Sequence, residues 1–217
     1  MDLLLDVGLP VLMQYVKRTT QGPLGSPLAQ SLARRIDVDG LIADLRSPDH
    51  QYIDVEYRTV RNLDERVEEI IKLANAAALD PEIHAASIKI TKGCFDNTIC
   101  QLRKIDTYLR EHFDYSQEAG EILQDPRLML DGTFQGGDCD DFSGLIGALA
   151  LSLRIPVKFR ISGPNQNTPS HIYPLLSTDK DNPNAAYIAM DLTRKESLGF
   201  DLTTQNLQVK IKDYDLY

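Results

Sequence analysis

"GGDCDDFSGLIGALALSLRIPVKFRI", residues 136–161, holds the pattern that decides the fold. It opens with two glycines and a cysteine, Cys139, that stands among aspartates, and then apolar residues recur every three or four positions. That spacing is typical of a helix with one face in a core, and the small residues at 143, 144, 147 and 148 suit close packing against a neighbour. We therefore predict a helix that begins at or near Cys139, followed by a β-strand over 155–161.

The position of Cys139 has chemical consequences. A cysteine in the first turn of a helix lies beside unpaired backbone N–H groups and the positive end of the helix dipole, and both favour a thiolate. The same N–H groups can bind a developing oxyanion. Gly136 and Gly137 would let the incoming backbone turn tightly and leave the sulfur open to a substrate. The flanking acids also favour the helix as charges of its first turn: Asp138, Asp140 and Asp141.

Two further β-like runs follow at 171–176 and 186–192, separated by turn-rich segments. A helix followed by short antiparallel strands predicts an α+β fold rather than a parallel βαβ sheet. His171 opens the first of these runs and Asp191 closes the second, so both side chains can meet Cys139 at one edge of the sheet. A nucleophilic cysteine needs a base, and the base needs an orienting group. The other histidines lie in a loop, in a turn or helix start, and at the end of a charged helix: His50, His84 and His112.

Upstream of this core, residues 62–78 and 97–113 show a helical period of apolar residues. Residues 1–60 combine helix-like stretches with a strand-like run and carry no recognisable chemistry. We therefore predict an accessory N-terminal region over 1–60, a candidate docking element, and a core domain over 61–217.

Three blocks in this order resemble the transglutaminase-like superfamily. They are the stretch 136–161, "SHIYPLL" at 170–176 and "YIAMDLT" at 187–193, and the resemblance covers roughly residues 97–195. Members share the papain-like cysteine-protease core, and the short length is similar to bacterial or prophage members. The resemblance implies N-terminal helices packed on an antiparallel sheet, with the nucleophile at a helix N-terminus.

The resemblance also implies the roles of the site residues. Cys139 would be the nucleophile, His171 the general base and then acid, and Asp191 the group that orients His171. The chain would then hydrolyse amide or peptide bonds in a protein or peptide substrate through a thioester acyl-enzyme. The Cys139 N–H would supply one oxyanion donor and Gln135 a second.

Two differences between this sequence and the family bear on the reaction that we expect. The chain has no tryptophan, so the indole of the animal cross-linking transglutaminases is missing, and transamidation is the weaker alternative to hydrolysis. The acids around the cysteine resemble a calcium-dependent branch of bacterial periplasmic proteases in the superfamily. No cofactor is otherwise expected, and the helix-capping acids are also the candidate calcium ligands: Asp138, Asp140 and Asp141.

A second hypothesis is that the chain has the transglutaminase-like fold but does not catalyse a reaction. Inactive relatives occur, and the domain can form part of a phage or prophage virion or an assembly. In this hypothesis residues 1–60 would dock a partner protein or a second copy of the chain.

Composition excludes several other classes. The net charge is −9 and the sequence pI is near 4.9, with no glycine-rich phosphate loop and no clustered basic segment, so we expect no nucleic-acid partner. No apolar run approaches the ~20 residues of a membrane span, and Asp2, Asp6 and Pro10 interrupt the N-terminal apolar stretch, so we expect neither a membrane anchor nor a secretory signal.

Three cysteines at irregular spacing predict free thiols, a reducing compartment and a cytoplasmic location, with a virion as the alternative.

Overall fold

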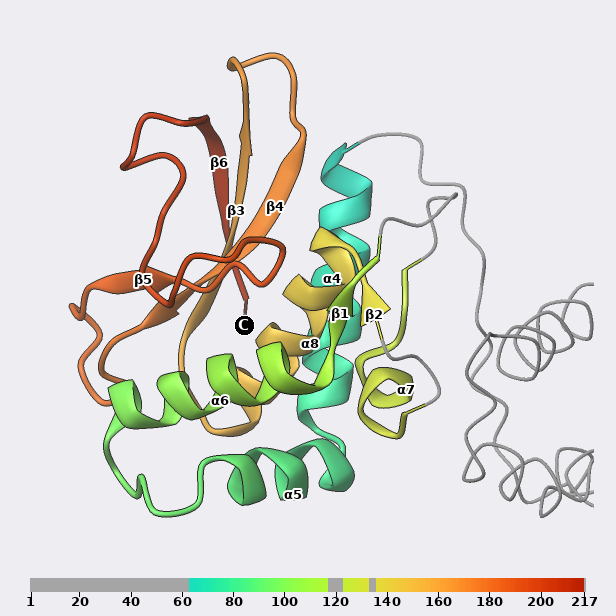
Figure 1. Cartoon of the computed structure of the whole chain (residues 1–217), viewed down its shortest axis with the longest axis vertical. Helices are drawn as coiled ribbons and strands as arrows, with labels where there is room; N and C mark the ends of the chain where they lie inside the picture. The colour runs from blue at the N-terminus through green and yellow to red at the C-terminus, as the bar shows by residue number, and fades with distance from the viewer. Residues whose placement is uncertain (1–62, 117–122, 133–135, 217) are drawn as a thin grey trace, which may run out of the picture. The chain divides into compact units, whose positions relative to one another are not determined.

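A computed structural model describes residues 63–116, 123–132 and 136–216, and Figure 1 shows the arrangement of their helices and strands. The predicted accessory region 1–60, together with His50 and Gln135, lies outside these residues, so what was expected of them remains a prediction.

The described residues form five helices and six strands, and the α+β prediction is confirmed. Strands β3, β4, β5 and β6 make an antiparallel sheet in the order β5-β4-β3-β6, while β1 and β2 form a separate parallel pair. The helices are α4 (Leu63–Ala78), α5 (Pro81–Ile90), α6 (Thr98–His112), α7 (Pro126–Leu130) and α8 (Cys139–Ser152). The strands are β1 (Asp114–Tyr115), β2 (Gly136–Gly137), β3 (Val157–Gly163), β4 (His171–Ser177), β5 (Tyr187–Ala189) and β6 (Val209–Asp215).

Helix α8 is the central element of the core. It begins at Cys139, as predicted, and packs against α4 on one side and against β4 on the other (Figure 1). A Cβ atom added at Gly147 would lie 3.1 Å from the Phe159 ring and 3.3 Å from the Ala74 Cβ. The close packing predicted from the small residues of this helix is therefore confirmed, and it lets the buried faces of α4 and the sheet meet α8 directly.

The prediction of free thiols is wrong for two of the three cysteines. Cys94 and Cys100 form a disulfide, with their Cα atoms 5.4 Å apart. Between the two cysteines the chain turns, with the Asn97 N–H donating to the Cys94 carbonyl at 2.9 Å, and the Asn97 side chain then accepts a hydrogen bond from the Cys100 N–H at the start of α6. This turn brings together two cysteines that are six residues apart, so the argument for a reducing compartment loses its basis. Cys139 remains as the free thiol.

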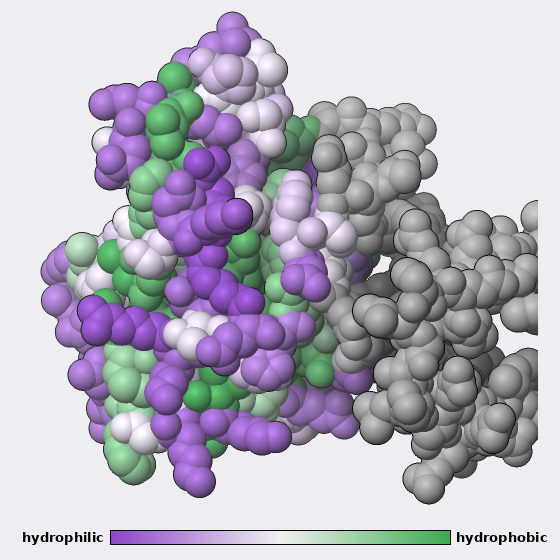
Figure 2. All heavy atoms as spheres, in the orientation of Figure 1, coloured by the Kyte–Doolittle hydropathy of each residue, from purple (hydrophilic) through white to green (hydrophobic). Residues whose placement is uncertain are grey.

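The surface of the described part is mixed in polarity. Figure 2 shows polar residues over much of the face seen in Figure 1, with apolar residues gathered in smaller patches between them. Among the described helices, none combines the length and the apolar character that crossing a bilayer requires.

Candidate active site

His171 and Asp191 meet through a short hydrogen bond. His171 is the first residue of β4 and Asp191 follows the end of β5 by two residues, and these neighbouring strands bring the His171 Nε2 within 2.7 Å of the Asp191 Oδ2. Their side chains are 12% and 4% exposed. Burial alone would raise the pKa of Asp191, but the hydrogen bond and charge of His171 and the hydrogen bonds from Thr193 outweigh it and lower that pKa. Asp191 is therefore a carboxylate at neutral pH.

Cys139 lies at the same cavity as His171. The cavity has a volume of about 380 Å³, and its lining includes Cys139, His171, Ile172 and Tyr115. The backbone of Ile172, the residue next to His171, lowers the pKa of the Cys139 thiol. The fold thus brings Cys139 and His171 to one cavity, and Asp191 is joined to His171 by the hydrogen bond without lining the cavity itself.

The expected preference of Cys139 for the thiolate is wrong for the resting site. Burial and the charges of Asp140 and Asp138 raise the pKa of the Cys139 thiol to about 12, although the Ile172 backbone and Arg66 act in the opposite direction. The helix terminus contributes only partial charges, and burial of the sulfur together with the nearby charge of Asp140 outweighs them. The thiol is therefore the resting form, and a base is needed to remove its proton.

The two glycines before Cys139 do not form the tight turn that was predicted. They form β2, an extended pair of residues beside β1. A Cβ atom at Gly136 would lie 2.6 Å from the Asp114 carbonyl oxygen, and one at Gly137 would lie 2.7 Å from the Asp141 Cβ. Glycine is required here because backbone and side chain approach each other closely, not because the chain turns.

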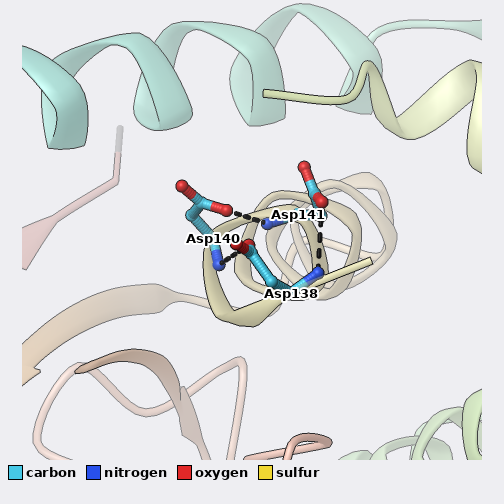
Figure 3. A group of neighbouring side chains, drawn as sticks. All are labelled: Asp138, Asp140 and Asp141. Atoms are coloured by element: carbon cyan, nitrogen blue, oxygen red, sulfur yellow. Dashed lines mark hydrogen bonds between the residues drawn. The ribbon is translucent and has the colours of Figure 1, made fainter. Parts of the chain in front are cut away.

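The three acids form a cap on α8, as Figure 3 shows. Asp138 is the N-cap residue and accepts a hydrogen bond from the Asp140 N–H at 3.2 Å, while Asp141 accepts one from the Asp138 N–H at 3.2 Å. Asp140 is also ion-paired with Arg66 of α4, whose Nε lies 2.6 Å from its Oδ2. The predicted helix-capping role is confirmed.

The same cluster has the chemistry of a calcium site. Oxygen atoms of Asp138, Asp140 and Asp141 lie within 4.8 Å of one another, and carboxylate oxygens are the ligands that calcium prefers. Burial, followed by the hydrogen bond and charge of Asp140 and the charge of Asp141, raises the pKa of Asp138 to about 8. Three acidic side chains therefore crowd together beside one guanidinium, that of Arg66, and their oxygen atoms are of the kind that ligates a hard divalent cation.

Sequence reasoning missed two residues of the cavity, Arg66 and Tyr115. Arg66 comes from α4, 74 positions before its partner Asp140, so no local pattern pairs them. Tyr115 belongs to β1, which lies beside β2 just before Cys139. Burial and the charges of Cys139 and Asp138 raise the pKa of Tyr115, so its hydroxyl keeps its proton and is a hydrogen-bond donor.

Two of the other histidines lie away from this cavity. His84 and His112 are exposed, and each makes a ring-nitrogen contact with a main-chain carbonyl, that of Ser152 at 3.0 Å and that of Tyr108 at 2.8 Å. Neither belongs to the lining of the Cys139 cavity.

Comparisons with known proteins give similar structures only at low identity. No family model matches the chain, and no curated protein matches it. A candidate cysteine protease from Cytophaga hutchinsonii is 19% identical with a TM-score of 0.46; the match covers 73% of this chain, which spans half the length of that one. EGTA-treated LapG from Legionella pneumophila is 16% identical with a TM-score of 0.41, over 68% of this chain and 81% of that chain. A second structure of the same LapG is 17% identical with a TM-score of 0.36, over 63% of this chain and 82% of that chain.

Proposed function

We propose that the chain is a cysteine peptidase or amidase in which Cys139, His171 and Asp191 act as a catalytic triad. The observation that carries the proposal is the 2.7 Å bond between the His171 Nε2 and the Asp191 Oδ2, at the edge of the cavity that Cys139 lines. When a neutral imidazole donates its Nε2 proton to a carboxylate, its Nδ1 is left as a proton acceptor. That is the form a general base needs.

In the proposed reaction the His171 Nδ1 takes the proton of the Cys139 thiol while the sulfur bonds to the carbonyl carbon of the substrate. The C–N bond then breaks, the leaving amine takes the proton from the imidazolium, and an acyl thioester remains. Water attacks the thioester with His171 again as base, the carboxylic acid leaves, and the sulfur regains a proton. The Cys139 N–H is proposed as an oxyanion donor, with Gln135 as the second.

The charges of the site support this order of events. Because burial and the flanking acids disfavour a free thiolate, the proton must leave as the sulfur attacks, and a nearby base has to receive it. The ionised Asp191 then stabilises the imidazolium that forms. A protein or peptide segment is the proposed substrate, and an amine in place of water would make the reaction a transamidation.

The reactivity of Cys139 tests the proposal. We expect iodoacetamide to alkylate Cys139 at pH 7 at least ~10-fold more slowly in His171→Ala than in the wild type, since the base is gone. Peptide mass spectrometry under non-reducing conditions measures the rate, and His112→Ala, an exposed histidine on α6, is the matched control. Equal rates in the wild type and His171→Ala would reject the triad and favour a binding or assembly role.

We further propose that Asp138, Asp140 and Asp141 hold a calcium ion while they cap α8. The ion would supply positive charge to a cluster in which three acidic side chains lie within 4.8 Å. At a calcium concentration near 100 times Kd, we expect the melting temperature to exceed that in EGTA by roughly 5 °C, because the ion binds only the folded chain.

Differential scanning calorimetry with calcium, magnesium or EGTA measures this shift. Asp140→Asn should abolish it, while Asp181→Asn, a change of an exposed acid in a turn, should leave it intact. Magnesium should give a smaller shift because it binds reluctantly outside octahedral geometry. A wild-type melting temperature that is the same in calcium and EGTA would restrict the three acids to the capping role.

A further inference from the structure

Asp191 lies in a segment outside the strands of the sheet. β5 ends at Ala189, and the last backbone bond toward β4 joins the Met190 N–H to the Pro174 carbonyl at 3.0 Å. Residues 190–200 are all described, and none of them belongs to a helix or strand. The segment is tied to the sheet near both ends, by the Met190 bond and by the Gly199 N–H, which donates to the Ala189 carbonyl at 2.8 Å, so the turn between them depends on further contacts.

The Asp191 side chain is oriented locally by Thr193. Its Oδ1 accepts hydrogen bonds from the Thr193 N–H at 3.1 Å and from the Thr193 hydroxyl at 2.7 Å. These two bonds occupy one carboxylate oxygen and leave Oδ2 for His171. They fix the orientation of the carboxylate. Because both bonds lie within one short turn, they do not fix the position of that turn relative to β4.

Arg110 of α6 holds this turn in place from a second element of the fold. Its guanidinium donates to the Asp191 carbonyl at 3.0 Å and to the Arg194 carbonyl at 2.5 Å, so it bridges both ends of the turn that carries Asp191. The third contact is its own Nε, which donates to the Asp106 Oδ1 at 2.9 Å one helical turn earlier. Asp106 is buried, with 8% of its surface exposed, and this ion pair aims the guanidinium at the turn.

We propose that Arg110, aimed by Asp106, is the positioning residue that holds Asp191 in reach of His171. The inference rests on the proposed function for its catalytic consequence, but the contacts themselves do not depend on turnover. A planar guanidinium can donate in three directions at once, which a lysine ammonium on a flexible stem does not reproduce with the same geometry. Arg110 thus links the helix α6 to the acid of the triad across 81 residues of sequence.

The test follows the bond between His171 and Asp191 directly. In protein labelled with ¹⁵N-histidine, the Nε2–H of His171 should give a signal that exchanges slowly with water, because a buried carboxylate accepts it. Arg110→Lys should raise the exchange rate about tenfold or more. Arg103→Met, a change at an exposed arginine of the same helix, is the matched control and should leave the rate unchanged. Asp191→Ala identifies the signal by removing its acceptor.

The outcomes separate the inference from the proposed function. Faster exchange in Arg110→Lys at an unchanged melting temperature supports positioning, and wild-type exchange in that variant overturns it. Asp106→Asn keeps Arg110 and should give a smaller effect in the same direction, which covers the case in which Arg110→Lys folds poorly. If the chain cleaves peptides, Arg110→Lys should lower kcat and leave KM unchanged. Faster exchange in Arg110→Lys, together with no cleavage by the wild type or any variant, would support the inference and reject the proposed enzymatic function.

Discussion

Replacing Cys139 with alanine should abolish peptide-bond cleavage, with a loss of at least ~10⁴-fold in kcat/KM, because the proposed acyl intermediate forms on its sulfur. Cys139 is the free cysteine of the chain and lines the cavity that His171 also lines. The measurement is cleavage of a proteome-derived peptide library, with new termini counted by mass spectrometry. The replacement removes one sulfur atom at the start of α8, so the fold should persist.

Two further variants make this result specific. Cys139→Ser keeps the shape of the side chain, but its hydroxyl is a much weaker acid than a thiol, so cleavage should be lost almost as completely. His112→Ala should cleave as the wild type does. Cleavage that survives in Cys139→Ala would contradict the triad, and a wild type that cleaves nothing would favour the assembly hypothesis, in which Cys139→Ser is tolerated and loss of residues 1–60 is not.

Replacing Arg160 with methionine should lower the free energy of unfolding by about 3 kcal/mol, because it removes the cation that the buried Asp201 and the half-buried Asp213 share and leaves Asp213 with the exposed Lys210. Arg160 of β3 makes two bonds to Asp213 of β6, at 2.8 and 2.9 Å, and one to Asp201 at 2.7 Å. Asp201 also accepts from the Tyr173 hydroxyl at 2.9 Å, so the cluster ties β3, β4 and β6 to the segment between β5 and β6. Urea unfolding measures the change.

The same cluster sets part of the acid sensitivity. Burial alone would raise the pKa values of Asp201 and Asp213, but hydrogen bonds from Thr203 and Tyr173 to Asp201, hydrogen bonds from Arg160 to Asp213, and the charge of Arg160 outweigh it and lower both. A lowered pKa in the folded state stabilises the fold above the unfolded value of about 4, and this contribution is lost as pH falls through the folded pKa.

The triple variant Arg160→Met, Asp201→Asn, Asp213→Asn is the control for the stability prediction. It removes the orphaned charges with the arginine, so it should be more stable than Arg160→Met alone and should lose less stability between pH 5 and pH 3. Equal stability of the single and triple variants would show that the carboxylates left without Arg160 cost nothing, and equal stability of Arg160→Met and the wild type would show that the ion pairs do not contribute.

What the sequence revealed about the site was its order along the chain. Cys139 at a predicted helix start, His171 at the start of one strand and Asp191 after the next are all local features. The fold then brings Cys139 and His171 to one cavity and sets Asp191 against His171. Helix α8 could be predicted because its apolar residues keep a helical period over four turns, and the caps of the helix are sequence neighbours of Cys139.

What the sequence did not reveal depended on distant partners. Arg66 and Arg110 are unremarkable residues of amphipathic helices until the fold sets them beside Asp140 and Asp191. Strand β6, "VKIKDYD", pairs with β3 and was not among the strands that the sequence analysis predicted. Helix α5 could have been predicted from the sequence, since Asp80 caps it and Pro81 lies in its first turn.

The disulfide between Cys94 and Cys100 also means that thiol labelling of the oxidised chain counts Cys139 alone. Of three cysteines, two are consumed in the bond and one is the proposed nucleophile. In oxidised protein, the stoichiometry of thiol labelling therefore equals the fraction of molecules with an intact nucleophile, and no substrate is needed to calibrate an assay. After strong reduction the label reports three sites, so the oxidation state of the preparation must be set before any specific activity is compared.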